Sequence, residues 1–275
     1  MAPLSLTILG AGPAGPNAGG ANSGYLVRHE DDAVVVDCGP GTAGRIPLHV
    51  PVNRLTAVAI SHLHPDHYFD LVALYYMLKY GEPRPADVTP LLPVFVPPGG
   101  RAFMARFGSL IADKPALFDD IFDLRDYAAD GEFALGQLTF TFHPVQHYVM
   151  SHAMRIGAPG GPRLVFSSDV APCPQIVEAA RGADLFLCES AMLDASQDET
   201  DPARRGHMSA REAGQAVREA GAKRLLITHY RSGEQYDHRH LAAAQSTFDG
   251  PVELAREGET YVVGLEVRPR FQAPV

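Results

Sequence analysis

Four side chains of metal-binding type follow one apolar run in the stretch AVAISHLHPDHYFD: His62, His64, Asp66 and His67. Side chains alternate on an extended turn, so residues 62 and 64 can face one point, while residues 66 and 67, at the start of a helix, can face a neighbouring point. Zinc accepts imidazole nitrogens and carboxylate oxygens as ligands, and two adjacent metal ions can share a bridging water as a nucleophile. The cluster therefore predicts a hydrolytic site with two metal ions.

The H-x-H-x-D-H turn resembles the signature of the metallo-β-lactamase superfamily, and the resemblance extends over nearly the whole chain. It implies an α/β fold, the four-layer αβ/βα sandwich. It also implies a further histidine, a bridging aspartate and a late histidine, which follow three later strands. The stretches FHPVQHYVMSHAMRI, LVFSSDVAP and RLLITHY supply His147, Asp169 and His229 for these places.

The first of these stretches contains two other histidines, His143 and His152. His147 lies eight residues before Arg155, which resembles the family's spacing from ligand to strand. We therefore expect His147 to be the ligand. The other two histidines are expected to be supporting or surface residues.

The resemblance implies one metal ion on His62, His64 and His147, and a second on Asp66, His67 and His229, with Asp169 bridging the two. Asp169 and His229 also follow apolar runs directly, at the edge where open α/β sheets collect their ligands. Five histidines and two aspartates suit two divalent ions, zinc first, with manganese or iron as alternatives.

Asp169 and His207 indicate which branch of the superfamily this chain resembles. Lactam-cleaving members usually have cysteine or serine in place of Asp169, which disfavours that activity. The stretch RRGHMSAREAGQAVREAGAKRLLITHY places His207 22 residues before His229 and resembles the histidine segment of ribonuclease Z-like phosphodiesterases. The resemblance implies that His207 is a charged donor or general acid toward a scissile phosphate, that Glu189 of FLCESA orients it, and that Asp66 orients the attacking water.

The predicted substrate is small. Only 22 residues separate His147 from Asp169, too few for the long arm with which many ribonuclease Z proteins grip transfer RNA. A net charge of −9 without long basic runs predicts no extended nucleic-acid surface. The layout resembles a short bacterial branch with cyclic-nucleotide phosphodiesterase-like members, which implies a small phosphodiester of the cyclic-nucleotide or RNA-end type. A lactone or other ester hydrolase and a non-catalytic metal-binding scaffold are the alternatives.

Several nearby residues are weaker candidates for the site. Tyr68 could line it, but an aromatic residue on a helix face is expected in the core. Arg204 and Arg205 could steer a phosphate, although solvated loop positions are expected for both. Asp237, in DHRH, is interpreted as a helix N-cap and not as a metal ligand.

The elements that must position these residues can be read from periodicity. Apolar runs after turn signals predict strands at 4–9, 24–29, 33–37, 57–60, 93–96, 138–142, 164–166, 185–188, 224–227, 252–254 and 261–263. Helical periodicity predicts helices at 69–79, 101–111, 174–180, 210–220 and 240–248, the fourth ended by Gly221. The proline-rich stretch 80–100 predicts a surface connection, and no linker divides the chain, so we expect one domain over 1–275.

The stretch TILGAGPAG raises a different possibility, because Gly10, Gly12 and Gly15 match the G-x-G-x-x-G spacing of a dinucleotide-binding loop and hence a redox protein. That loop must open a helix, and Pro13 and Pro16 interrupt one here. We expect a strand and a loop that borders the metal site, where backbone N–H groups could meet a phosphate.

Composition indicates an ordinary globular protein, with 46% hydrophobic residues and no apolar window long enough for a membrane span. The first residues lack the features of a signal peptide, and the three cysteines, Cys38, Cys173 and Cys188, have no C-x-x-C spacing. We therefore expect reduced thiols, a cytoplasmic location and no membrane partner. A homodimer is common among similar proteins.

Overall fold

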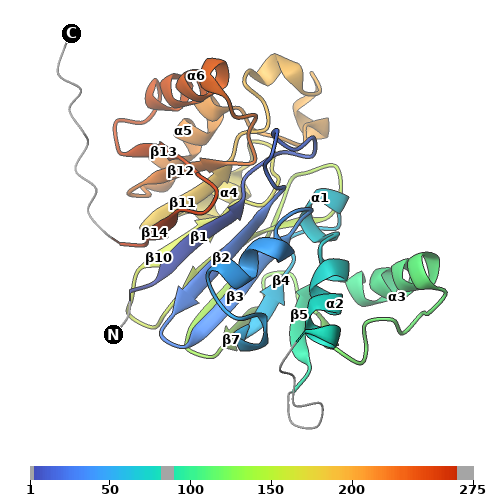
Figure 1. Cartoon of the computed structure of the whole chain (residues 1–275). Coiled ribbons are helices and arrows are strands. Elements are labelled where there is room, and N and C mark those ends of the chain that lie inside the picture. The colour runs from blue at the N-terminus through green and yellow to red at the C-terminus, as the bar shows by residue number, and fades with distance from the viewer. Residues whose placement is uncertain (1–2, 82–89, 265–275) are drawn as a thin grey trace.

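Two seven-stranded sheets pack face to face, with helices on both outer faces (Figure 1). The computed structural model describes residues 3–81 and 90–264. The first sheet has the order β14 (Thr260–Val262), β1 (Ser5–Gly10), β2 (Gly24–His29), β3 (Asp32–Cys38), β4 (Ala57–Ala59), β5 (Leu92–Val96) and β6 (Phe122–Asp126). The second has the order β13 (Val252–Leu254), β12 (Leu225–Thr228), β11 (Leu185–Glu189), β10 (Arg163–Phe166), β9 (Ser151–Gly157), β8 (Leu138–Val145) and β7 (Glu132–Leu135).

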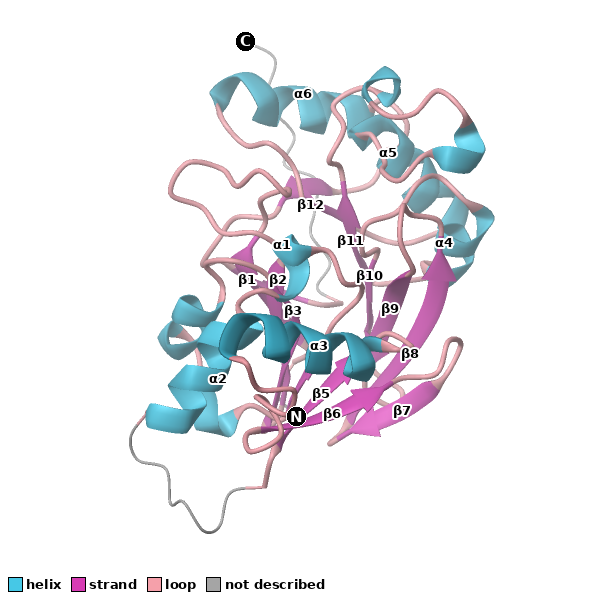
Figure 2. Cartoon of the chain, turned by 90° about the vertical axis from the view of Figure 1, so that its right-hand side faces the viewer, coloured by secondary structure: helices cyan, strands magenta, loops and turns pink. Residues whose placement is uncertain are grey.

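The helices divide between the two outer faces. The first sheet is covered by α2 (Leu71–Tyr80) and α3 (Gly100–Ala112), with the 3-10 helices η1 (Ala43–Leu48) and η2 (Val52–Arg54). The second sheet is covered by α4 (Pro174–Ala179), α5 (Ala210–Ala220) and α6 (Glu234–Gln245). A short helix α1 (Pro65–Tyr68) follows β4, and the 3-10 helices η3 (Ala195–Gln197) and η4 (Pro202–Arg204) lie between β11 and α5. Figure 2 shows α3 and α2 in front of the first sheet. This arrangement confirms the four-layer αβ/βα sandwich.

The central strands are buried on both faces, which is why they read as continuous apolar runs. In β3, Val34 and Val36 belong to the core between the sheets, whereas Ala33 and Val35 pack against the outer helices. The two sheets are also joined by a hydrogen bond, 2.8 Å long, between the hydroxyls of Tyr25 on β2 and Thr228 on β12. The sandwich thereby fixes β3 and β12, whose ends carry residues of the site described below.

Helix α5 follows its sequence signals closely. Ser209 and Glu212 form a reciprocal capping box at its start, and Gly221 ends it with φ of 62°. Helix α6 begins at Glu234, six residues before the predicted start. The N-cap is Gly233, so the interpretation of Asp237 as N-cap is wrong. Asp237 lies in the first turn, where its carboxylate accepts a hydrogen bond from the Gly233 N–H.

Three strands carry too little apolar pattern to be predicted. The strands β6, with sequence FDLRD, and β7, with sequence EFAL, each end a sheet, and each has two exposed residues. The strand β9 contains His152 among small and long side chains. Such strands form because a neighbouring strand pairs with them, which local composition does not encode.

The glycine-rich stretch at the N-terminus is a strand end and a loop. Strand β1 ends at Gly10, and the chain returns antiparallel as β2, so no helix follows the glycines and the dinucleotide-binding interpretation is wrong. A Cβ on Gly10 would lie 1.9 Å from the carbonyl oxygen of Asn22, whereas Gly15 has open space around it. The loop borders the segment after β12, because the Tyr230 N–H donates to the Ala11 carbonyl.

Part of the proline-rich stretch, 82–89, lies outside the described residues. Tyr80 ends α2, and the residues from 90 onward lead into β5 and the turn into α3. No helix in the described ranges is long and apolar enough to cross a membrane. All three cysteines carry free thiols, with Cys38 and Cys188 buried and Cys173 partly exposed.

The glycine geometry makes a stability prediction. Gly10→Ala forces the backbone away from Asn22, and we expect a loss of about 1–3 kcal/mol in the free energy of unfolding. Gly15→Ala, in the same loop, is the matched control and should change that free energy by less than about 0.5 kcal/mol. Denaturant unfolding of the three proteins measures both values, and equal stability of the two variants would contradict the packing argument.

Candidate metal centre

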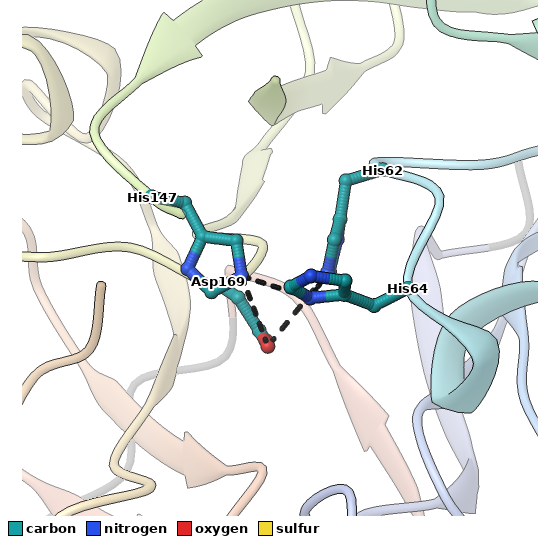
Figure 3. A group of neighbouring side chains, drawn as sticks. All are labelled: His62, His64, His147 and Asp169. Atoms are coloured by element: carbon teal, nitrogen blue, oxygen red, sulfur yellow. Dashed lines mark hydrogen bonds and ion pairs between the residues drawn. The ribbon is translucent and has the colours of Figure 1, made fainter. Parts of the chain in front are cut away.

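One group of ligand atoms gathers three histidines and one aspartate. The ring nitrogens of His62, His64 and His147 and the carboxylate of Asp169 point toward one another (Figure 3). Nδ1 of His64 lies 3.2 Å from Nε2 of His62 and 3.1 Å from Nε2 of His147. Asp169 Oδ2 completes the group, 3.8 Å from the nitrogen of His62 and 3.9 Å from that of His147.

A second group shares the same aspartate oxygen. Nε2 of His67 lies 3.4 Å from both Asp66 Oδ2 and Asp169 Oδ2. Nε2 of His229 lies 3.2 Å from Asp66 Oδ2 and 3.5 Å from Asp169 Oδ2. Each group therefore has four ligand atoms, and Asp169 Oδ2 belongs to both.

These separations fit tetrahedral metal coordination. With metal–ligand bonds of about 2.0–2.2 Å, the ligand atoms of a tetrahedral zinc site lie about 3.3–3.6 Å apart. The buried atoms His67 Nε2 and Asp169 Oδ1 have no hydrogen-bond partner. Buried polar atoms without partners are rare, and a cation beside these atoms would satisfy them. The donor set and its geometry thus fit two divalent ions.

Strand ends and tight turns position the ligands. His62 and His64 follow β4, and Pro65 at the first position of α1 starts the turn that presents Asp66 and His67. Asp169 follows β10 and His229 follows β12. His229, with φ of 49°, adopts the left-handed backbone conformation that non-glycine residues rarely take. Such local strain is typical of positions that the surrounding structure holds for a function.

A backbone close approach also holds the α1 turn. A Cβ on Gly39 would lie 1.9 Å from the carbonyl oxygen of Asp66. The chain after β3 therefore packs directly against the backbone of a ligand residue. Only glycine, which has no Cβ, allows the stretch VVVDCGPG to approach Asp66 this closely at position 39.

A layer of hydrogen bonds fixes which ring nitrogen faces each group. The buried carboxylate of Asp37 accepts from His67 Nδ1 at 2.7 Å, and from the N–H and the hydroxyl of Ser61 at 2.7 and 2.8 Å. His147 Nδ1 donates to the Gly206 carbonyl at 2.6 Å. His62 Nδ1 lies 3.1 Å from the Ser61 hydroxyl. In these three rings Nε2 is thereby left for a metal ion, an arrangement typical of protein metal sites, whereas His64 presents Nδ1 to its group.

The electrostatics favour the forms that bind metals. Burial lowers the pKa of His62, His64 and His147, which favours the neutral ring. Burial opposes ionisation of Asp66 and Asp169, but neighbouring histidines hold both carboxyl pKa values low.

His67 differs from the other ligand histidines. Burial alone would lower its pKa, but the charges of Asp169 and Asp37 raise that pKa well above the usual range. The surrounding carboxylates therefore favour positive charge at the Nε2 position of His67. A metal cation would supply that charge there.

His207 and Glu189 form a hydrogen-bonded pair beside both groups. His207 Nδ1 donates to Glu189 Oε1 at 2.9 Å, and the same oxygen accepts from the Val170 N–H at 2.8 Å. The ring of His207 lies 5.0 Å from that of His147 and 5.8 Å from that of His229, measured between centroids. Burial would lower the pKa of His207, but the charge and hydrogen bond of Glu189 raise it to about 9.

The segment that carries His207 is clamped to the β8–β9 loop by three consecutive side chains. Gln146 donates to the carbonyls of Pro202 and Arg205, His147 donates to that of Gly206, and the Tyr148 hydroxyl donates to Asp198. The second carboxylate oxygen of Asp198 accepts the N–H groups of Gly206 and His207, each at 3.0 Å. The contacts place His207 next to the ligand His147.

The remaining candidate residues lie outside the two groups. His143, half-buried, bonds to Thr141 on its own strand, and His152 is buried against Tyr127. Tyr68 is 3% exposed and packs among phenylalanines in the core under the outer helices. The burial of Tyr68 agrees with the core position expected from the sequence.

The two arginines near His207 differ from each other. Arg204 is exposed and pairs with Glu199 at 3.4 Å. Arg205 is not a solvated residue, because its guanidinium forms a bidentate pair with Glu212 and also donates to the His207 carbonyl. Because Glu212 already occupies the guanidinium of Arg205, its pairing disfavours phosphate steering by that residue.

Sequence reasoning missed two of the supporting acids. Asp37 lies at the end of the apolar strand β3, and Asp169 follows the apolar strand β10, so the same type of sequence pattern marked Asp37. Asp198 lies in an irregular segment without any comparable signal, and only its five contacts identify it.

Several known proteins are similar to this chain along most of its length. The model of the Beta-lactamase superfamily domain matches residues 32–230, which include every ligand in the two groups. An uncharacterized protein of Mycobacterium leprae is 33% identical, and the alignment covers 94% of this chain and 88% of that protein. The ribonuclease Z of Myxococcus xanthus is 28% identical over 96% of this chain and 99% of its own length.

A solved structure is also similar. The probable metallo-hydrolase YhfI of Bacillus subtilis is 30% identical over 93% of this chain and 98% of that protein. Its crystal structure, described as a metallo-β-lactamase fold protein, aligns with a TM-score of 0.79 over 94% of this chain and 100% of that chain. The family match confirms the resemblance stated from the sequence.

Asp37 provides a test of the second ligand group. Asp37→Asn removes the negative charge that holds His67, and we expect metal affinity at that group to fall about 10–100-fold. Metal content after dialysis against a graded series of chelator concentrations should then show early loss of one ion, with retention of the other. Asp31→Asn, at an exposed position, is the control. Equal retention of both ions in Asp37→Asn would contradict the role of Asp37.

Proposed function

The chain belongs to the β-lactamase superfamily, and we propose that it is a hydrolase with two metal ions that acts on small phosphodiesters. The observation that carries the proposal is the His207–Glu189 pair beside two adjacent ligand groups. Nδ1 of His207 donates to Glu189, so Nε2 of His207 is the nitrogen that can contact a substrate. A protonated donor at this position matches the negative oxygens of a phosphodiester in its transition state.

The ligand sets are His62, His64 and His147 for one ion and Asp66, His67 and His229 for the other, with Asp169 shared. Divalent ions held there, zinc by our proposal with manganese or iron as alternatives, would lower the pKa of water and neutralise charge on the phosphate. The ionised Asp66 carboxylate provides an acceptor that orients the attacking water. His207, with its pKa raised to about 9, is positively charged at neutral pH and can protonate the leaving oxygen.

Two observations support a small substrate of the cyclic-nucleotide or RNA-end type. Between His147 and Asp169 the chain forms only β9, a turn and β10, with no protruding arm. The net charge of −9 does not favour a long nucleic acid, since binding one requires lysines and arginines along its phosphates. We propose that this chain shares the reaction class named for the ribonuclease Z relative but takes smaller substrates.

The alternatives use the same ligand groups differently. A lactone or other ester hydrolase does not require a charged donor at His207, and a non-catalytic scaffold would bind metal without turnover.

The free thiols fit a reducing compartment, and we propose a cytoplasmic location on that basis.

Metal content and turnover test the core of the proposal. We expect about two divalent ions per chain, as one ion per ligand group requires. Chelation should abolish hydrolysis of bis(p-nitrophenyl) phosphate, and zinc or manganese should restore it. Elemental analysis together with a panel of cyclic mononucleotides, this reporter and lactones makes the measurement. Less than one ion per chain after reconstitution would overturn the proposal, and turnover of lactones alone would favour the ester hydrolase.

His207 and Glu189 test the assignment to phosphodiesters. His207→Ala should lower kcat for the phosphodiester reporter by about 10²–10⁴-fold, the usual effect of losing a general acid. Glu189→Gln keeps a hydrogen-bond acceptor without the charge, so a smaller loss is expected. Metal content should remain at the wild-type level in both, and His238→Ala, an exposed histidine of α6, should be as active as wild type. Unchanged turnover in His207→Ala would remove this residue from the reaction.

A further inference from the structure

The β8–β9 loop presents three consecutive large apolar side chains to solvent directly after the ligand His147. Tyr148, Val149 and Met150 are 52%, 40% and 58% exposed. In the part of the chain that the structure describes, no other three consecutive large apolar residues are so exposed. Contiguous apolar exposure is unfavourable in water and commonly marks a binding surface.

The position of Tyr148 places this surface at the edge of the metal centre. Its ring centroid lies 5.0 Å from that of His147 and 5.4 Å from that of His207. The first ring belongs to a ligand group and the second to the proposed acid. The Tyr148 ring is therefore within reach of the rest of a substrate whose phosphate lies at the ligand groups.

The Tyr148 ring is also held in a defined orientation. Its hydroxyl donates to Asp198, whose side chain is 1% exposed, and the ring lies so close to Gly206 that a Cβ there would meet it at 2.5 Å. A ring that is fixed before binding loses little conformational entropy when a ligand packs on it. A tethered tyrosine with half of its surface exposed is thus suited to stacking, whereas a burial role alone would not leave it open.

We propose that Tyr148, with Val149 and Met150 beside it, is a stacking platform for the planar base of a nucleotide phosphodiester. The inference rests on the proposed function and adds to it the side chain that contacts the base of the substrate. Every nucleobase has a flat face, and stacking on an aromatic side chain is tolerant of base identity. The Tyr148 hydroxyl already donates to Asp198, so the ring offers a base its apolar face and the platform recognises the flat shape of the base.

The platform is tested by comparing the binding affinities of two ligands, one with a base and one without. Calorimetry on the metal-loaded protein compares adenosine monophosphate with ribose 5-phosphate, and we expect about tenfold tighter binding of the nucleotide. Tyr148→Ala should reduce this ratio to about one. Tyr148→Phe keeps the ring and should retain the ratio, and Tyr80→Ala, an exposed tyrosine on α2, should retain it as well.

Other outcomes overturn the platform. A ratio near one in the wild-type protein, or a ratio that survives in Tyr148→Ala, contradicts stacking. Equal loss in Tyr148→Phe and Tyr148→Ala assigns Tyr148 to holding Asp198 through its hydroxyl, without a base contact. Turnover of a cyclic ribose phosphate that lacks a base is measured in parallel. If that substrate is hydrolysed while the ratio is near one, the platform fails and the proposed phosphodiesterase stands, whereas no turnover of any phosphodiester rejects the proposed function itself.

Discussion

One carboxylate oxygen is the centre on which the site depends. Asp169 Oδ2 lies 3.4–3.9 Å from the ring nitrogens of four histidines, His62, His67, His147 and His229. These histidines come from three separate segments, which follow β4, β8 and β12. A buried carboxylate surrounded by nitrogen ligands is costly without cations, and it is suited to divalent ions on either side of it. The remainder of the sandwich brings the three segments to this oxygen.

Three buried acids hold that arrangement, each by the same device. Asp37 accepts from the Ser61 N–H and from His67, and Asp198 accepts the N–H groups of Gly206 and His207. Glu189 accepts from the Val170 N–H and from His207 with a single oxygen. Charge-assisted hydrogen bonds offset the cost of burying each acid. Because Val170 adjoins Asp169, which both ligand groups share, Glu189 couples the position of the proposed acid to that of the two groups.

The fold alone does not define the reaction, because one sandwich can carry different chemistry on its loops. Two segments border the ligand groups beside His147 and His207, the β8–β9 loop and residues 198–207. Gln146, His147 and Tyr148 each bond to the second segment, so the two segments behave as one wall of the site. The two ligand groups thus lie at the strand ends of the sandwich, and this wall lies beside them.

The sequence by itself determined the features that depend on local spacing. The H-x-H-x-D-H turn encodes its own geometry through a strand end and a helix start, and Asp169 and His229 are marked by the apolar strands before them. The start of α6 could not be predicted from the sequence, because it follows a glycine N-cap. The short strands β6 and β7 could not be predicted either, because they form by pairing with a neighbouring strand. Tertiary structure alone decided that Asp37 supports His67, that Asp198 holds the His207 segment and that Arg205 is paired with Glu212. Periodicity reports which residues face the core, but contacts between segments far apart in the chain arise only when the sheets pack.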